Sequence, residues 1–310
     1  MDQDSRRRAL FVAALALCAT PWVGAATALV LGIAFSLGLG NPWPASTACA
    51  SKIMLQLSVV GLGFGLHLGE VLQTGRSSFA YTLVGITGTL VLGFMLGRLF
   101  KTDQNTSALI AFGTAICGGS AIAALAPVLK AKNEETAVAL ATVFTLNTVA
   151  LLLFPAIAHL LQLDQGTFGV WAGLAIHDTS SVVGAASVYG DEALAIGTTV
   201  KLTRALWITP VVLGLAVVKR SEQKARVPLF IVGFLLAATI RTSFPQFESL
   251  WGALTALARQ CLVVTLFLIG AGLSREVLRK VGVRPLLQGV TLWLLVSGLT
   301  LAALLGFGAG

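Results

Sequence analysis

Charged residues are scarce in this sequence, and their scarcity excludes whole classes of protein. Asp, Glu, Lys and Arg make up 11% of the 310 residues, whereas about a quarter of a typical soluble domain is charged. Hydrophobic residues reach 56%, and the mean hydropathy is +0.88. So few charges exclude a soluble enzyme and a nucleic-acid-binding domain. We therefore expect a chain that is embedded in a lipid bilayer.

Cysteine and histidine are also few, and several motifs are missing altogether. The four cysteines lie far apart and show no CxxC or metal-ligand spacing, so we expect neither a disulfide framework nor a metal site. The sequence has no ATP-binding loop, no HExxH motif and no serine in a nucleophile elbow. We therefore predict a protein that is not an enzyme, has no cofactor and takes its energy from a gradient or a partner.

Long apolar runs are what the sequence does contain. There are about eleven of them, and most have the roughly 20 residues that a helix needs to cross a bilayer. They cover residues 9–20, 22–40, 53–73, 78–100, 108–129, 136–161, 168–189, 193–218, 227–240, 250–273 and 285–307. We predict an all-α polytopic membrane protein with about 9–11 transmembrane segments.

The basic residues lie in short loops between these runs. The net charge is +8, and the most basic loops are residues 219–226 and 275–284. The positive-inside rule places both loops on the cytoplasmic side. Arg98, Lys101, Lys130 and Lys132 also fall inside, provided that residues 108–129 enter and leave on one face. The arginines at positions 6–8 fall inside as well if the first short run crosses the membrane. The positive charge therefore indicates topology and not a nucleic-acid partner.

Two internal repeats indicate how the chain is organised. Residues 113–128 match residues 173–188 at six positions, an offset of 60. A second match, at an offset of 207, pairs Gly63 with Gly270 and Gly65 with Gly272. We predict one membrane domain, residues 1–310, built from inverted repeats. Its core elements are residues 107–218, and its scaffold is residues 9–100 and 226–310.

Two of the apolar runs are interrupted near their middle by small and polar residues. The first contains Gly118, Gly119 and Ser120, and the second contains Thr179, Ser180 and Ser181. Non-helical backbone at membrane depth must line a cavity or be buried in protein. A half-helix that begins after a break points its free N–H groups at whatever binds there. We predict two broken or re-entrant helices that bind an anion; glycines that only allow close helix packing are the alternative.

Ionisable residues accompany the second break. His177 and Asp178 lie within an apolar run, where a charge costs about 2.5–3.5 kcal/mol on insertion scales. We predict that they carry a coupling proton or help to bind a coupling ion such as Na⁺. A satisfied structural pair is the alternative.

Lys201 and Arg204 stand three residues apart on one face of a predicted helix, too deep to reach the interface. Asp178 is the acidic residue at similar depth. Two cations and one carboxylate leave one excess positive charge, which would attract an anion. We expect Arg204→Gln to abolish anion binding without unfolding the protein. The alternative is a Lys201–Asp178 pair with Arg204 capping backbone carbonyls.

Three motifs of this chain resemble a known family. They are residues 113–124, residues 176–178 and residues 200–204. They are similar, in this order, to motifs of the YeiH-type family of bacterial inner-membrane proteins, which are labelled sulfate exporters. Many relatives have Glu and Gln where this chain has Asp178 and Ser181. More distantly, the first break resembles the crossing-helix region of bile-acid symporters and cation/proton antiporters.

The resemblance implies a multi-pass protein of the bacterial inner membrane that transports sulfate or a related sulfur oxyanion. It also implies two inverted halves with a mobile core, and a homodimer is one common arrangement of such folds. Together with the residues, it predicts a secondary transporter for a small inorganic or organic anion, coupled to H⁺ or Na⁺. A passive anion channel and an intramembrane enzyme are the alternatives.

Overall fold

The computed structural model describes residues 3–219, 229–272 and 282–307. Throughout these ranges the regular structure is helical, and six helices are long and apolar enough to cross a membrane. Two further helices, Ala25–Gly38 and Leu229–Ser243, are apolar but shorter. The all-α polytopic class that the sequence predicts is confirmed.

The chain divides into two compact units. The first comprises Met1–Leu72 and Pro228–Glu276, and the second comprises Gln73–Val227 and Val277–Gly310. The second unit contains the whole predicted core, residues 107–218. It also contains two long helices from the ranges that were predicted as scaffold.

The first unit holds five α-helices and one 3₁₀ turn within the described residues. They are α1 (Gln3–Cys18), α2 (Ala25–Gly38), α3 (Pro44–Gly63), α13 (Leu229–Ser243), η1 (Pro245–Phe247) and α14 (Glu248–Ala271). The amphipathic helix α4 (Leu68–Ser77) leads from this unit into the second. Helix α3 begins earlier than its apolar run because Pro44 suits the first helical turn. The apolar run 53–73 is not one helix, because α3 ends at Gly63 and α4 begins at Leu68.

Glycines let the helices of the first unit approach closely. Gly63 of α3 lies against the carbonyl oxygen of Phe234 in α13, and Gly270 of α14 lies against that of Leu29 in α2. Gly63 and Gly270 are partners in the repeat with an offset of 207. Each therefore packs on the backbone of the short helix that belongs to the other copy, as small residues do at helix interfaces in membranes.

The Phe11 side chain packs helix α1 onto two other helices of the first unit. The Phe11 ring lies 5.3 Å from that of Phe35 in α2 and 5.3 Å from that of Phe267 in α14. Phe11 is only 3% exposed. Edge and tilted contacts of this kind add to the stabilisation that burial of the ring provides.

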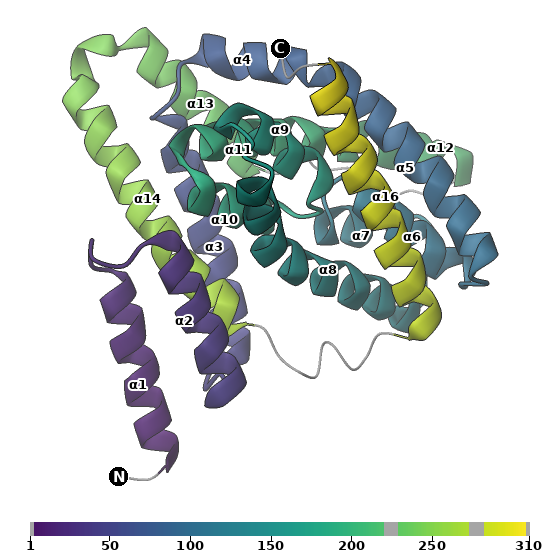
Figure 1. Cartoon of the computed structure of the whole chain (residues 1–310), viewed down its shortest axis with the longest axis horizontal. Helices are drawn as coiled ribbons and strands as arrows, with labels where there is room; N and C mark the ends of the chain where they lie inside the picture. The colour runs from purple at the N-terminus through teal and green to yellow at the C-terminus, as the bar shows by residue number, and fades with distance from the viewer. Residues whose placement is uncertain (1–2, 220–228, 273–281, 308–310) are drawn as a thin grey trace. The chain divides into compact units, whose positions relative to one another are not determined.

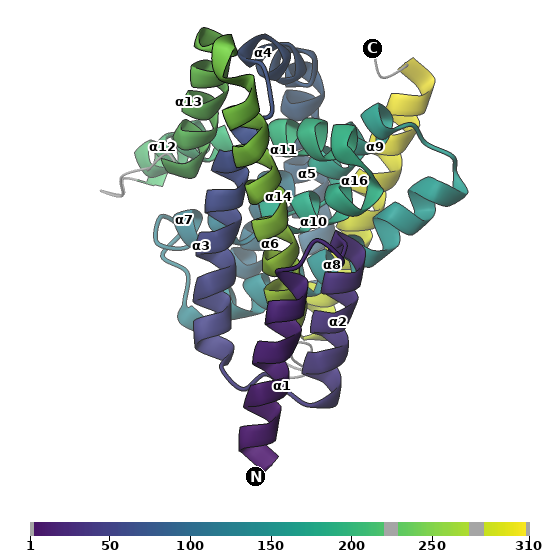
Figure 2. The same ribbon diagram turned by 90° about the vertical axis from the view of Figure 1, so that its left-hand side faces the viewer.

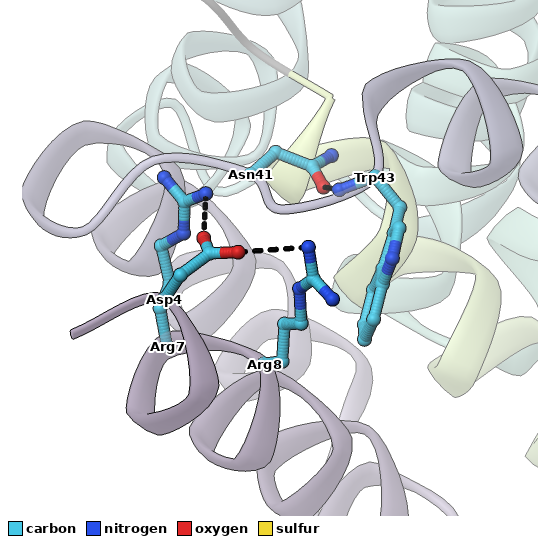
Figure 3. A network of polar contacts seen from close by, with 5 residues as sticks. All are labelled: Asp4, Arg7, Arg8, Asn41 and Trp43. Atoms are coloured by element: carbon cyan, nitrogen blue, oxygen red, sulfur yellow. Dashed lines mark hydrogen bonds and ion pairs between the residues drawn. The ribbon is translucent and has the colours of Figure 1, made fainter. Parts of the chain in front are cut away.

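The basic start of α1 is organised by one carboxylate (Figure 3). Asp4 pairs with Arg7 at 2.6 Å and with Arg8 at 2.7 Å. The Arg8 guanidinium lies 5.9 Å from the ring centre of Trp43, just before α3. The Trp43 backbone N–H in turn donates to the side-chain oxygen of Asn41 at 2.9 Å. Two of the N-terminal arginines that were used to predict orientation are thus ion-paired.

Besides the end of α4, the second unit holds nine helices among the described residues. Figure 1 labels each of them. They are α5 (Phe79–Leu99), α6 (Gln104–Ala115), α7 (Gly119–Leu125), α8 (Asn133–Leu160), α9 (Gln165–Ala175), α10 (Thr179–Tyr189), α11 (Asp191–Leu206), α12 (Ile208–Lys219) and α16 (Val283–Phe307). Helix α11 packs along α9, as Figure 2 also shows.

The helix boundaries follow both sequence repeats. An offset of 60 carries α6 onto α9 and the start of α7 onto the start of α10. An offset of 207 carries α2 onto α13, α3 onto α14 and also α5 onto α16, beyond the positions that match in sequence. The basic loops used for orientation, residues 219–226 and 275–284, lie almost entirely outside the described residues.

Candidate functional site

The first predicted break is a sharp turn between α6 and α7. Helix α6 ends at Ala115, and Gly118 has φ 63° and ψ −126°, a backbone conformation that favours glycine. The Gly118 N–H donates to the carbonyl oxygen of Gly113 at 2.8 Å, and the Ile122 side chain packs against Gly113. A continuous helix would separate Gly113 from Ile122 by about 13 Å. The segment therefore turns back on itself at Gly118. That it enters and leaves the membrane on one face stays a prediction.

The second break is closed by a helix cap. Helix α9 ends at Ala175, and Asp178 is the N-cap of α10. One carboxylate oxygen of Asp178 accepts from the backbone N–H of Ser181 at 2.6 Å, and the other accepts from the Ser180 hydroxyl at 3.0 Å. Asp178 thus stabilises the start of α10. Its part in ion coupling stays a prediction.

The two breaks touch at equivalent positions of the repeat. A Cβ atom on Gly118 would lie 3.2 Å from the Cβ atom of Asp178 and 3.4 Å from the carbonyl carbon of His177. Gly118 and Asp178 are separated by the repeat offset of 60. Gly118 therefore forms the break and also allows close packing. Anion binding at this break stays a prediction.

Arg204 ties the two breaks together. Its side chain is 2% exposed. Its Nε donates to the carbonyl oxygen of Ala115 at 2.7 Å, and one terminal nitrogen donates to that of Thr114 at 2.7 Å. The other terminal nitrogen donates to the carbonyl oxygen of Leu174. Thr114 and Leu174 occupy the same position in the two copies, so one guanidinium caps the carbonyl ends of both half-helices, where the helix dipoles are negative.

Lys201 acts in the same way one turn earlier on α11. Its ammonium is fully buried and donates to the carbonyl oxygen of Ile176 at 2.6 Å. No ion pair joins Lys201 to Asp178 in the described structure. The alternative interpretation agrees with the structure in one respect, because Arg204 caps backbone carbonyls. It differs in the other, because Lys201 also caps a backbone carbonyl, and the Asp178 carboxylate caps α10 instead of pairing with Lys201. Direct contact of either cation with an anion stays a prediction.

His177 is buried between the second break and α8. Its backbone N–H donates to the side-chain oxygen of Asn147 at 3.2 Å, and both side chains are at most 3% exposed. Neither ring nitrogen of His177 nor the side-chain nitrogen of Asn147 has a well-formed hydrogen bond within the part of the chain that is described. Buried polar groups in this state mark places where water or a small ligand binds.

The hydroxyls and N–H groups of the predicted site differ in burial. Ser181 is buried, Gly119, Thr179 and Ser180 are half-buried, and Ser120 is exposed. Five of the predicted site residues therefore lie together where the two breaks meet. They are Gly118, His177, Asp178, Lys201 and Arg204. Ser120 stands at the exposed edge of this group.

The carbonyl oxygens of Thr114, Ala115 and Leu174 were missed as functional groups. Any residue provides such an acceptor, so the side chains at these positions give no signal. Gln288 of α16 was also missed, although it is fully buried and donates to the Gly93 carbonyl at 3.0 Å. Its polarity within an apolar run was the one available signal. Among the described residues, no group of three or more His, Cys, Asp or Glu side chains could hold a metal ion.

Comparison with known proteins agrees with these motifs. Residues 9–289 match the model of a family described as conserved hypothetical protein 698. The chain is 68% identical to a UPF0324 membrane protein of Geobacter sulfurreducens, over 98% of both chains. It is 50% identical to one of Bdellovibrio bacteriovorus, over 98% of this chain and 96% of that relative. No solved structure matches the chain. This chain, with its two touching helix breaks, therefore belongs to the UPF0324 family of membrane proteins, the YeiH-type family that its motifs resemble.

Proposed function

We propose that this protein is a secondary transporter of the bacterial inner membrane that moves a small anion by alternating access. The anion is a sulfur oxyanion such as sulfate or sulfite, or a sulfonate. One observation carries the proposal, namely that Arg204 caps the equivalent carbonyls of Thr114 and Leu174 where the two helix breaks meet. Paired discontinuous helices from internal repeats are how secondary transporters build their substrate and ion sites.

The charges at this crossing favour an anion. Lys201 and Arg204 bring two positive charges, and Asp178 brings one negative charge, so one positive charge is in excess when His177 is neutral. The carbonyls around both cations offset part of that charge through the helix dipoles. In this proposal the cations attract the anion electrostatically while they hold the carbonyl ends in place.

In this proposal the direct contacts to the anion come from donors that are less buried than the two cations. They are the Thr179 hydroxyl and the N–H groups at Gly119 and Ser120. The Ser180 hydroxyl is already donated to Asp178. Hydrogen bonds to an anion are stronger than bonds between neutral groups. The candidate for H⁺ or Na⁺ coupling is the buried imidazole of His177, whose ring nitrogens lack a well-formed hydrogen bond within the described residues, together with Asp178 beside it.

The test is anion exchange in liposomes. The full-length protein is reconstituted with unlabelled anion inside, and uptake of radiolabelled sulfate, sulfite, thiosulfate and taurine is followed with and without pH and Na⁺ gradients. We expect saturable uptake that is accelerated by the same anion on the opposite side. Thr179→Val should reduce this exchange about tenfold or more, since one hydrogen bond to a charged group is worth about 1.5–3 kcal/mol.

Ser187→Ala is the matched control, because the Ser187 hydroxyl lies on the same helix and bonds to the Gly184 carbonyl at 2.9 Å. It should exchange anions at the wild-type rate. Uptake that never saturates and shows no counterflow would indicate a channel. Chemical conversion of the anion would indicate an enzyme, and no movement of any anion in the panel would reject the proposal.

A further inference from the structure

An apolar cavity lies beside the crossing of the two breaks, entirely within the second unit. Its volume is about 490 Å³, and its long walls are α5 and the repeat-related helix α16. Leu174 of α9 and Arg204 of α11 also line it. The cavity therefore reaches two of the residues that join the breaks.

The long walls of the cavity are mainly apolar, and its edge is open. Leu92 of α5 and Leu299 of α16 both line it, and they are partners in the repeat with an offset of 207. Val84 and Leu299 are 72% and 60% exposed. Apolar side chains with this exposure on membrane helices face lipid. The cavity thus opens sideways along an apolar surface.

Two polar groups in this cavity have unused hydrogen-bonding capacity. A guanidinium carries five N–H donors, and three of its bonds, to Thr114, Ala115 and Leu174, are accounted for in Arg204. The Thr82 side chain is 1% exposed, and its hydroxyl has no hydrogen-bond partner among the described residues. Thr82 and Arg204 both line the cavity. Apolar walls with a few polar groups that fix orientation are typical of sites for organic ligands.

We propose that this cavity binds an organic anion with an apolar body, of the alkylsulfonate class, whose charged group lies at Arg204 and Thr82 while its alkyl chain lies between α5 and α16. The inference rests on the proposed function for the claim that this anion is also transported. An inorganic oxyanion such as sulfate would leave the apolar walls without a partner. An alkyl chain that lies between these walls is itself removed from water, which is favourable.

Two glycines allow the cavity to be filled without strain. Gly85 and Gly88 of α5 line it, and a Cβ atom on either would meet no atom within 4 Å. Gly88→Leu therefore puts a side chain into the cavity while the backbone stays helical. Gly298→Leu is the matched control, since Gly298 of α16 also has open space around its Cβ position but does not line the cavity.

The experiment measures binding by the full-length protein in lipid nanodiscs. The probes are hexanesulfonate, sulfate and the neutral hexanesulfonamide, and binding is read from thermal stabilisation and from calorimetric titration. Hexanesulfonate should bind the wild type, and Gly88→Leu should weaken it about tenfold or more because the alkyl chain loses its cavity. Gly298→Leu should bind as the wild type does.

The other outcomes separate this inference from the proposed function. Equal binding of hexanesulfonamide would overturn the inference, since the cavity would then be an apolar groove for lipid without charge recognition. The protein could instead bind and exchange sulfate, unaffected by Gly88→Leu, and fail to bind hexanesulfonate. That result would also overturn the inference, while the transport proposal would stand. Hexanesulfonate that binds in the cavity but is never exchanged would support the site and count against transport.

Discussion

Arg204 donates a hydrogen bond of 2.7 Å to the carbonyl oxygen of Thr114, although 90 residues separate them in the chain. Thr114 belongs to the first copy of the repeat, and Arg204 follows the second copy. The same guanidinium donates to Leu174, which holds the position of Thr114 in that second copy. These bonds change the expectation that Arg204→Gln leaves the fold intact, because three buried carbonyls would lose their donor.

Arg204→Lys should strongly destabilise the protein. A lysine ammonium is a single point and cannot span the carbonyls of Thr114 and Leu174 as a planar fork does. Each buried carbonyl left without a partner costs about 1–3 kcal/mol. We expect the midpoint of thermal unfolding in detergent to fall clearly, whereas Arg98→Lys on the exposed end of α5 should leave it unchanged. Equal midpoints for the two variants would contradict the assigned role of Arg204.

Asn147→Leu should destabilise the second break. The substitution removes the acceptor of the buried His177 N–H, at a cost of about 1–3 kcal/mol. Thr145→Val on the same helix is the control, because the Thr145 hydroxyl bonds only to the Ala141 carbonyl one turn earlier. Its effect should stay within about 0.5 kcal/mol. Denaturant titration of both variants compares them, and the hypothesis fails if Thr145→Val costs as much as Asn147→Leu.

Gly32→Ala should separate two helices of the first unit. A Cβ atom there would overlap the backbone carbonyl of Phe267 in α14 and lie 2.9 Å from the backbone nitrogen of Ala271. Backbone cannot move aside as a flexible side chain does, so we expect a loss of about 1–3 kcal/mol. Gly38→Ala, on the same helix with open space around its Cβ position, should change stability by about 0.5 kcal/mol or less. Thermal unfolding of both variants in nanodiscs tests this difference.

The pH dependence of stability should include a contribution from Asp164, the N-cap of α9. Hydrogen bonds from the backbone N–H and then the hydroxyl of Thr167 hold the pKa of this carboxyl below its ordinary value. A lowered pKa in the folded state stabilises the protein above the unfolded pKa, and this stability is lost as the pH falls through the folded pKa. The difference in unfolding midpoint between the wild type and Asp164→Asn should therefore shrink on acidification. A difference that is independent of pH would contradict this role.

Much of the candidate site could be predicted from the sequence because its elements have local causes. Gly118 marks the first break, since few other residues adopt its backbone conformation. Asp178 marks the second, since a short carboxylate is a preferred helix cap. The repeat with an offset of 60 relates the two breaks to each other from the sequence alone. The side-chain orientations of Lys201 and Arg204 have no such local cause. The sequence therefore left open whether these cations bind an anion or cap and pair with groups of the protein.

Hydropathy and backbone preferences act over a few residues, so the membrane-spanning class, the positions of the breaks and their relation by repeats can be predicted from the sequence. The turn of the first break back onto α6, the contact of Gly118 with Asp178 and the capping of both half-helices by Arg204 are evident only in the folded chain. They could not be predicted because the acceptors of Arg204 are backbone carbonyls 30 to 90 residues away. Every residue carries such a group, so their pairing with one guanidinium depends on the packing of the whole unit.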